Sequence, residues 1–364
     1  MSKQRPKRRV YVLEGKTEEN IAMAMAITSR SPEPFDKILS QIDEKKSSNF
    51  LEKFYITYGH GSIADTAFIH IAIENISQIA VKALENSRLA TYQEKSTRYQ
   101  IITRENTVEP KEIQNSPKHH RIYQETINLL YDLYDEFVEK LLGQARAKIK
   151  RNPGESESTY ENRIRIPVID RCRLVMPTAV MCNVGMTMSG RSIEYTVAKL
   201  VSSQLTEVRE LGEEIRKVAI KKLPILVKFS DPITYQIKLE KELRKEAEKI
   251  CGKSTKKHSQ GKSVDLVGYD KDALDKVTAA SLERFSGSPF SDIKEKVKKM
   301  SDKQKERLFD KIIGERKQRH DKPLRELEST HYIFDIVCDF GAFKDLQRHR
   351  MTTQTLQNFT TDLG

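Results

Sequence analysis

The residues of this chain that could do chemistry are concentrated between positions 85 and 100, after an apolar segment. Within six positions this stretch presents an acid, a hydroxyl, a guanidinium group and a phenol, namely Glu94, Ser96, Arg98 and Tyr99. A guanidinium group binds phosphate bidentately, and a carboxylate or hydroxyl hydrogen-bonds sugar hydroxyls or a base edge. The spacing therefore indicates a site for an anionic, hydrogen-bonding ligand. A helix terminus with a solvated polar face has the same composition and stays an alternative.

The elements that must position these residues are expected to form an α+β fold, with a central mixed or antiparallel sheet flanked by long helices. The pattern predicts strands at 10–13 and from Ile101, and helices over 21–28, 35–54, 63–84, 124–148 and 192–220. The helix over 63–84 is mostly apolar, so we expect it to be buried near the centre of the fold. Its side chains Phe68, Ile71, Ile76 and Ile79 should then be largely inaccessible.

Composition restricts the class of protein. The chain has 364 residues, enough for two domains, of which 37% are hydrophobic and 32% charged. No apolar run is long enough to span a membrane, and the run at 10–13 is too short for a signal peptide. The four cysteines are scattered without a Cys-x-x-Cys pair. We therefore expect a cytoplasmic protein with no membrane segment and no structural metal.

The formal net charge is +12. A basic surface attracts polyanions such as nucleotides, folates or nucleic acid. The same charge also serves plain solubility, so it does not choose among these ligands.

Several sequence blocks resemble one known family. The first block reads Tyr58-Gly59-His60-Gly61-Ser62-Ile63-Ala64-Asp65, and it is followed by Arg88 and then Glu94-x-Ser96-x-Arg98-Tyr99. Downstream stand Cys172-Arg173-Leu174-Val175-Met176-Pro177, Ser189-Gly190-Arg191-Ser192-Ile193 and Glu207-Val208. In this order the blocks resemble the flavin-dependent thymidylate synthases. The chain departs from the family at Asn86-Ser87-Arg88, where the family has Arg-His-Arg, and at Thr66, where it has His.

The resemblance implies a reaction. Such an enzyme methylates dUMP reductively to dTMP, taking the methylene group from methylenetetrahydrofolate. FAD is the cofactor, and NADPH is the source of electrons. The family's sites lie at the interfaces of homotetramers, so a homo-oligomer is implied here, most simply a dimer of tandem chains.

The sequence also shows signs of an internal repeat. Phe290 follows Phe35 by 255 positions (290 − 35), Glu328 follows Asp65 by 263 (328 − 65), and Arg350 follows Arg88 by 262 (350 − 88). A near-constant offset is typical of a duplicated domain, although a chance match would give weak similarity too. We predict a first repeat at 1–235, a charged helix and linker at 236–263, and an incomplete second repeat at 264–364. The chain ends before a second copy of the Arg173 and Arg191 blocks, either naturally or as a fragment.

The two repeats retain complementary parts of the motif. Repeat one keeps Glu94-x-Ser96-x-Arg98, whereas repeat two has Arg348-His349-Arg350 without the acid, serine and arginine that should follow. We therefore hypothesise a composite site, in which repeat one binds the nucleotide and repeat two the flavin. The alternative is a non-catalytic descendant that binds nucleotide or nucleic acid.

The resemblance and the repeat together assign residues to this site. The implied nucleotide contacts are Glu94, Ser96, Thr97, Arg98, Arg173 and Lys199, with Arg98 and Arg173 also acting in catalysis. The implied flavin contacts are Ser62, Asp65, Arg88, Arg191, Glu328, Arg348, His349 and Arg350. Arg173 could instead form an interdomain salt bridge, and His60 could be a plain loop residue.

Overall fold

The structure is a computed structural model that describes residues 8–252 and 263–361. Its chain divides into two compact units. The first unit comprises Met1–Ser254 together with Lys344–Thr355, and the second comprises Thr255–Phe343 together with Leu356–Gly364. We call Lys344–Thr355 the returning segment, because it belongs to the first unit although in sequence it lies between the two parts of the second.

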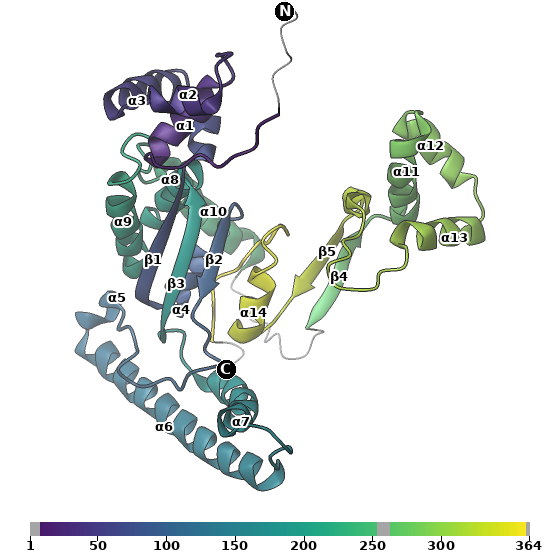
Figure 1. Cartoon of the computed structure of the whole chain (residues 1–364). Helices are drawn as coiled ribbons and strands as arrows, with labels where there is room; N and C mark the ends of the chain where they lie inside the picture. The colour runs from purple at the N-terminus through teal and green to yellow at the C-terminus, as the bar shows by residue number, and fades with distance from the viewer. Residues whose placement is uncertain (1–7, 253–262, 362–364) are drawn as a thin grey trace, which may run out of the picture. The chain divides into compact units, whose positions relative to one another are not determined.

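The first unit carries the following elements (Figure 1). Its helices are α1 (Glu18–Ile27), α2 (Phe35–Ser40), α3 (Glu44–Leu51), α4 (Gln78–Leu84), α5 (Lys111–Gln114), α6 (Pro117–Lys148), α7 (Glu157–Cys172), α8 (Gly190–Val201), α9 (Thr206–Ile220) and α10 (Thr234–Cys251). A π-helix, η1 (Glu52–Thr57), and the 3-10 helices η2 (Gly61–Thr66) and η3 (Arg173–Val175) join them. Its strands are β1 (Phe68–Ser77), β2 (Ala90–Glu94) and β3 (Met181–Ser189).

The second unit contains β4 (Val264–Tyr269), α11 (Ala273–Ser286), α12 (Phe290–Lys298), α13 (Asp302–Ile313), η5 (Arg325–Ser329) and β5 (Tyr332–Ile336). Strands β4 and β5 pair antiparallel. Helix α14 (Phe340–Gln347) leads from this unit into the returning segment. The chain is thus a mixture of helices and small antiparallel sheets, which confirms the α+β prediction at that level.

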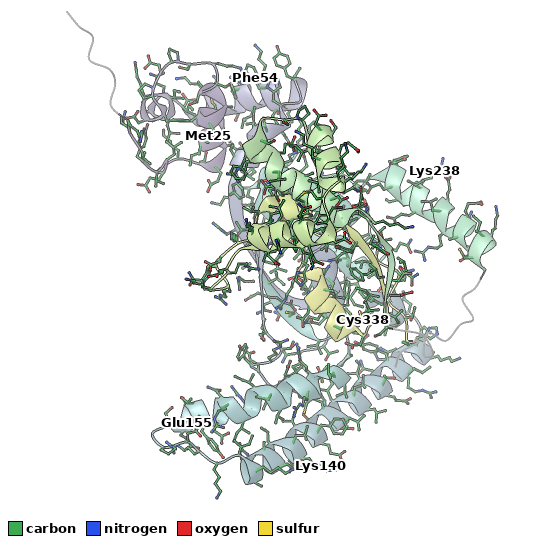
Figure 2. The ribbon with its side chains drawn as sticks, turned by 90° about the vertical axis from the view of Figure 1, so that its right-hand side faces the viewer. Met25, Phe54, Lys140, Glu155, Lys238 and Cys338 are labelled. Carbon is green, nitrogen blue, oxygen red and sulfur yellow. The ribbon has the colours of Figure 1, made fainter. Side chains whose placement is uncertain are left out.

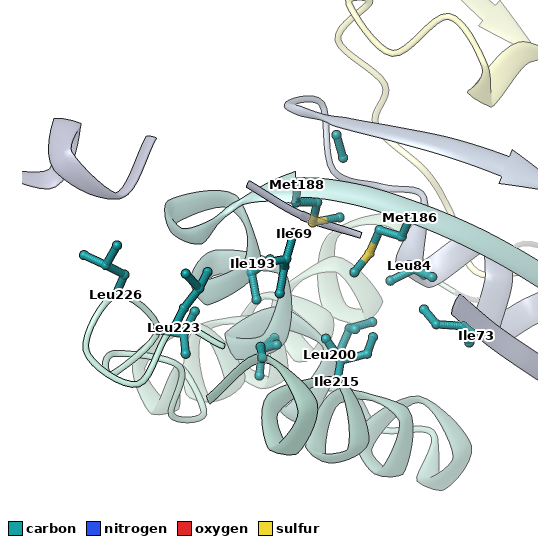
Figure 3. Close-up of a cluster of buried hydrophobic side chains, with 14 of the residues drawn as sticks. Ile69, Ile73, Leu84, Met186, Met188, Ile193, Leu200, Ile215, Leu223 and Leu226 are labelled. Carbon is teal, nitrogen blue, oxygen red and sulfur yellow. The ribbon is translucent and has the colours of Figure 1, made fainter. Parts of the chain in front are cut away.

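The sheet of the first unit positions the site. Its strands run antiparallel in the order β1–β3–β2, with Ile73 and Glu94 both opposite Val184. Alternate side chains face a core that α4, α8 and α9 complete, and Figure 3 shows Met186 and Met188 reaching into it. Because successive side chains point to opposite faces of a strand, β2 directs Ala90, Tyr92 and Glu94 toward the core.

The helix predicted over 63–84 is wrong. Residues 68–77 form β1, and helix α4 begins only at Gln78, with Ser77 as its N-cap. Ile76 is buried, but Ile71 and Ile79 are half-buried and Phe68 is 52% exposed. A continuous apolar run fits a buried helix and a buried strand equally well, and here the β-branched residues at alternate positions favour the strand.

Other predicted elements need correction. The helix over 35–54 is interrupted at residues 41–43, because Asp43 caps a new helix by accepting from the Lys46 amide at 2.8 Å. The helix over 192–220 is divided between α8 and α9. No strand forms at 10–13 or at Ile101. These short apolar runs have no partner strand in the described part of the chain to satisfy their backbone groups.

Several local predictions are confirmed. The helix predicted over 21–28 corresponds to α1, which Thr17 caps by accepting a hydrogen bond from the Asn20 amide at 3.3 Å. The helix over 124–148 lies within α6, which packs against α7 around buried Tyr131 and Tyr134. Figure 2 shows helices α6 and α7 side by side, with Lys140 on α6 and Glu155 in the loop that joins the two helices. The charged helix after 236 lies within α10, and the linker predicted after it lies outside the described residues.

Among the described helices, none combines the length and the hydropathy required to cross a bilayer.

Candidate functional site

The site is built on the loop that leaves β2. The β2–β3 pairing continues past Glu94 through a hydrogen bond from the Lys95 amide to the Asn183 carbonyl at 2.8 Å. The Ser96 hydroxyl then accepts from the Arg98 amide at 3.2 Å, which turns the chain. The sheet therefore sends Glu94 inward, whereas Ser96, Thr97 and Arg98 stay half-buried at its edge.

Glu94 is buried among cations. Its side chain is 7% exposed, and its carboxylate lies 2.9 Å from Lys344 Nζ, 3.2 Å from Lys82 Nζ and 4.0 Å from the Arg348 guanidinium. Burial alone would favour the neutral acid. The ammonium groups of Lys344 and Lys82 outweigh it and lower the pKa of Glu94. The structure therefore presents Glu94 as an ionised hydrogen-bond acceptor.

Arg98 and Arg173 converge on one carboxylate. Arg98 Nε lies 3.0 Å from Asp170 Oδ1, and a terminal nitrogen of Arg173 lies 2.7 Å from the same oxygen. Arg173 also donates to the Thr97 hydroxyl at 2.8 Å. Its Nε is buried and has no hydrogen-bond partner among the residues that the structure describes. Each guanidinium group retains N–H donors for a ligand, and this orphaned donor is the kind that an anion satisfies.

The returning segment contacts this site directly. Lys344 donates to the Gln78 side chain, and Gln347 Nε2 donates to the Lys82 carbonyl at 2.8 Å. Asp345 lies 3.7 Å from Arg98. The residues beyond the helix extend the contact, because Arg88 donates to the Thr353 hydroxyl at 3.2 Å. Part of the predicted second repeat thus lies against residues that are predicted to bind the nucleotide.

Arg350 and its neighbours lie at the edge of these contacts. The Arg350 guanidinium is 5.9 Å from the centre of the Tyr92 ring. His349 is exposed and donates its backbone N–H to the Leu346 carbonyl at 3.0 Å. An open hollow of about 300 Å³ lies along the sheet at Gln93 and Glu94, and a smaller one of about 30 Å³ lies at Ser96 and Thr97. Neither of these two hollows is lined by an arginine of the predicted site.

Other predicted site residues lie elsewhere. Arg191 pairs with Asp65 at 3.0 Å, and Ser62 is exposed on the same 3-10 helix as Asp65, η2. These residues lie where β1 begins opposite the end of β3, at the other end of the sheet from Glu94. They form a second cluster, and within the described residues no hydrogen bond or ion pair joins it to the loop after β2.

The remaining predicted residues are separate from both clusters. Lys199 is on α8, with its ammonium 5.5 Å from the centre of the Tyr195 ring, and burial lowers its pKa. Glu328 is in the second unit, where it pairs with Arg325 at 3.2 Å. Glu207 accepts hydrogen bonds from the backbone amide and the hydroxyl of Ser77 at 2.7 and 2.6 Å. Ser77 is itself the N-cap residue of α4.

Comparison with known proteins identifies the family of this chain. Residues 12–225, which include β2, its loop and Arg173, match the family model described as thymidylate synthase complementing protein. The chain belongs to the thymidylate synthase complementing protein family. The flavin-dependent thymidylate synthase resemblance seen in the sequence is therefore confirmed at the level of the family.

Relatives of this family member fall into two groups. A UPF0159 protein of Chlamydia muridarum is 29% identical over 333 residues, covering 88% of this chain and 63% of the relative. The chain thus spans a little under two thirds of that relative's length. A flavin-dependent thymidylate synthase of Clostridium tetani is 24% identical over 216 residues, covering 59% of this chain and 82% of the relative.

One solved structure is a remote neighbour of this family member. It is a UMP/dUMP methylase of Streptomyces cacaoi bound with 5-Br dUMP. It is 11% identical, covers 59% of this chain and 90% of its own, and has a TM-score of 0.42. At that level of similarity it carries no argument about the site.

Sequence reasoning missed the partners of the family motif. Asp170, Lys82, Lys344 and Asp345 were not predicted, although each contacts Glu94, Arg98 or Arg173. One signal was available. Lys344 follows Lys82 by 262 positions (344 − 82), the same offset that relates Arg350 to Arg88. A search for equivalent positions would have paired the two lysines.

Proposed function

We propose that this chain binds dUMP and methylates it reductively to dTMP, as the flavin-dependent thymidylate synthases do. The observation that carries the proposal is the convergence of Arg98 and Arg173 beside Thr97, with a buried Arg173 donor left without a partner in the described part of the chain. Guanidinium groups from separate sequence blocks, meeting at one polar loop, form a phosphate site. The family match supports a nucleotide as its ligand.

In this proposal the chain's own residues bind and orient the substrate. Arg98 and Arg173 hold the phosphate by displacing their shared carboxylate, Asp170. Thr97 and Ser96 hydrogen-bond the sugar or phosphate, and ionised Glu94 accepts from a hydroxyl or ring N–H. Lys199 stays a weaker candidate, since its ammonium lies over Tyr195 of its own helix α8.

FAD fits the donor set around the returning segment. Arg88, Arg348 and His349 are exposed. Arg350 is half-buried against the Tyr92 ring. These cations suit the pyrophosphate and ring oxygens of a flavin. When bound, reduced flavin supplies the hydride, with NADPH as electron source and methylenetetrahydrofolate as carbon donor. Ser62, Asp65, Arg191 and Glu328 remain predicted flavin contacts.

A tandem duplication is part of the proposal, and the order of elements supports it. The elements α11, α12, α13, η5, β5 and α14 follow one another as α1, α2, α3, η2, β1 and α4 do, although η1, which lies between α3 and η2, has no counterpart among the described elements. Strand β5 follows β1 by 264 positions (332 − 68) and α14 follows α4 by 262 (340 − 78). We keep the predicted repeat boundaries on this ground.

Purified protein with all 364 residues tests the reaction. We expect blue-region absorbance from bound oxidised flavin and dTMP formation from dUMP, methylenetetrahydrofolate and NADPH. A second function, nucleotide or nucleic-acid binding without catalysis, is favoured by Asn86-Ser87 in place of Arg-His. Colourless protein that makes no dTMP when FAD is added, but still binds dUMP or nucleic acid, would leave only that second function.

The division of labour between repeats predicts separable effects. Arg350→Ala should lower flavin occupancy and leave dUMP affinity nearly unchanged, because Arg350 lies against the Tyr92 ring and not within the Arg98 and Arg173 cluster. Flavin absorbance per protein and calorimetric dUMP titration measure the two effects. Equal losses of both ligands would contradict the division.

We also propose a homo-oligomer. In the second unit β5 is exposed along its whole length, including Ile333 at 53% and Phe334 at 51%. Apolar surface of this kind favours association, and burying it between copies would stabilise an assembly. Sizing coupled to light scattering should report a dimer or larger species at micromolar concentration. A clean monomer would count against the proposal.

A further inference from the structure

The Glu94 carboxylate is surrounded by three cations and a thiol. Its neighbours are Lys82 on α4, Lys344 and Arg348 on the returning segment, and the Cys182 thiol on β3 at 3.8 Å. The Lys82 side chain is 2% exposed and the Lys344 side chain 12%. A carboxylate this deeply buried stays ionised only beside compensating cations.

Lys82 forms ion pairs with two carboxylates, whereas Lys344 forms one with Glu94 alone among the described residues. The Lys82 ammonium also pairs with Glu85, so its charge is divided between two carboxylates. Lys344 has the shorter contact with Glu94, 2.9 Å against 3.2 Å, and its ammonium also donates to the neutral Gln78 amide. Lys344 is therefore the principal counter-ion of Glu94.

In the proposed duplication, Lys82 and Lys344 occupy equivalent positions. Lys344 follows Lys82 by 262 positions, and the residue 262 positions after Glu94 is Leu356 (94 + 262). Two position-equivalent lysines thus converge on a single carboxylate, whose counterpart in the other repeat is apolar. The second repeat supplies a cation to a site that it does not itself possess.

We propose that Lys344 is a positioning residue of the nucleotide site, which holds the Glu94 carboxylate ionised and oriented as an acceptor for a hydroxyl or ring N–H of the nucleotide. This rests on the proposed function for the identity of the ligand. Lys344 itself need not touch the nucleotide, because the Gln78 amide and the Glu94 carboxylate already engage its ammonium. The returning segment then contributes to substrate binding as well as to the predicted flavin site.

Removing Lys344 should make nucleotide binding depend on pH. In Lys344→Met the pKa of Glu94 rises, because desolvation is then opposed by shared Lys82 and by Arg348 at 4.0 Å. A protonated carboxyl is a poorer acceptor, so dUMP affinity should fall roughly tenfold at about pH 6, as for one lost charge-assisted hydrogen bond. Affinity should recover as the pH rises through the raised pKa. Lys344→Arg should behave like the native chain.

Calorimetric titration of dUMP between about pH 6 and 9 tests this in the native chain, Lys344→Met, Lys344→Arg, Glu94→Gln and the Lys344→Met/Glu94→Gln pair. Lys111→Met, which removes one positive charge from an exposed pair with Glu210, controls for net charge and should leave dUMP affinity unchanged. Thermal unfolding verifies that each variant is folded. In the Glu94→Gln background Lys344→Met should have no further effect, because the group that it positions is already neutral.

Two results would overturn the inference. One is a loss of affinity in Lys344→Met that is equal at every pH, and the other is an additive loss in the double variant. If the native chain binds no dUMP, the proposed function fails, and carbon-detected NMR titration of the Glu94 carboxyl then decides the role of Lys344. A higher Glu94 pKa in Lys344→Met would support that role, and an unchanged one would refute it.

Discussion

Arg98→Ala should weaken dUMP binding roughly 10- to 100-fold, because a charge-assisted contact to the phosphate is lost. Arg173→Ala should weaken it by at least as much. Its Nε is the buried donor without a described partner, and its loss also releases Thr97 and Asp170. Equilibrium titration with dUMP measures both. The double variant should lose less than the product of the single losses, because the two arginines share Asp170.

The chain offers a matched control for this experiment. Arg104 has the same side-chain exposure as Arg98, 42%, and likewise pairs with an aspartate, Asp132. It lies in the loop before α5 and contacts α6 residues that have no part in the site. Arg104→Ala should leave dUMP affinity unchanged. If it matches the loss in Arg98→Ala, the effect is one of net charge, and the phosphate site is refuted.

Gly212→Ala should destabilise the first unit by about 1–3 kcal/mol, the usual cost of overpacking a core. Gly212 is on α9 where it crosses α8, and an added Cβ would lie 2.8 Å from Val201 Cγ1 and 2.9 Å from Leu200 Cβ. Both neighbours are buried, so neither can move away freely. The shift of the urea unfolding midpoint measures the cost.

Gly143→Ala is the control of opposite sign. Gly143 lies within α6, and nothing lies within 4 Å of an added Cβ. Alanine lowers the backbone entropy lost on folding, so this variant should be more stable by about 0.5–1 kcal/mol. A stabilising or neutral Gly212→Ala would show that α8 and α9 are not packed as closely as the structure has them.

Local chemistry determined much of this protein from sequence alone. The Thr17 cap and the periodic apolar face of α6 depend on neighbours a few positions away, so each could be predicted. The Glu94-x-Ser96-x-Arg98 spacing and the Arg173 block likewise pointed to the family by themselves, because the chemistry of a phosphate site is carried by residue types.

Only the tertiary structure decided what faces these residues. The strand at 68–77 could not be distinguished from a helix, because its state depends on pairing with β3, more than a hundred positions away. Asp170 meets Arg98, and Lys344 meets Glu94, through folding that no local pattern encodes. Burial then converts an ordinary glutamate into a carboxylate that needs a distant lysine, since a buried charge is stable only when it is paired.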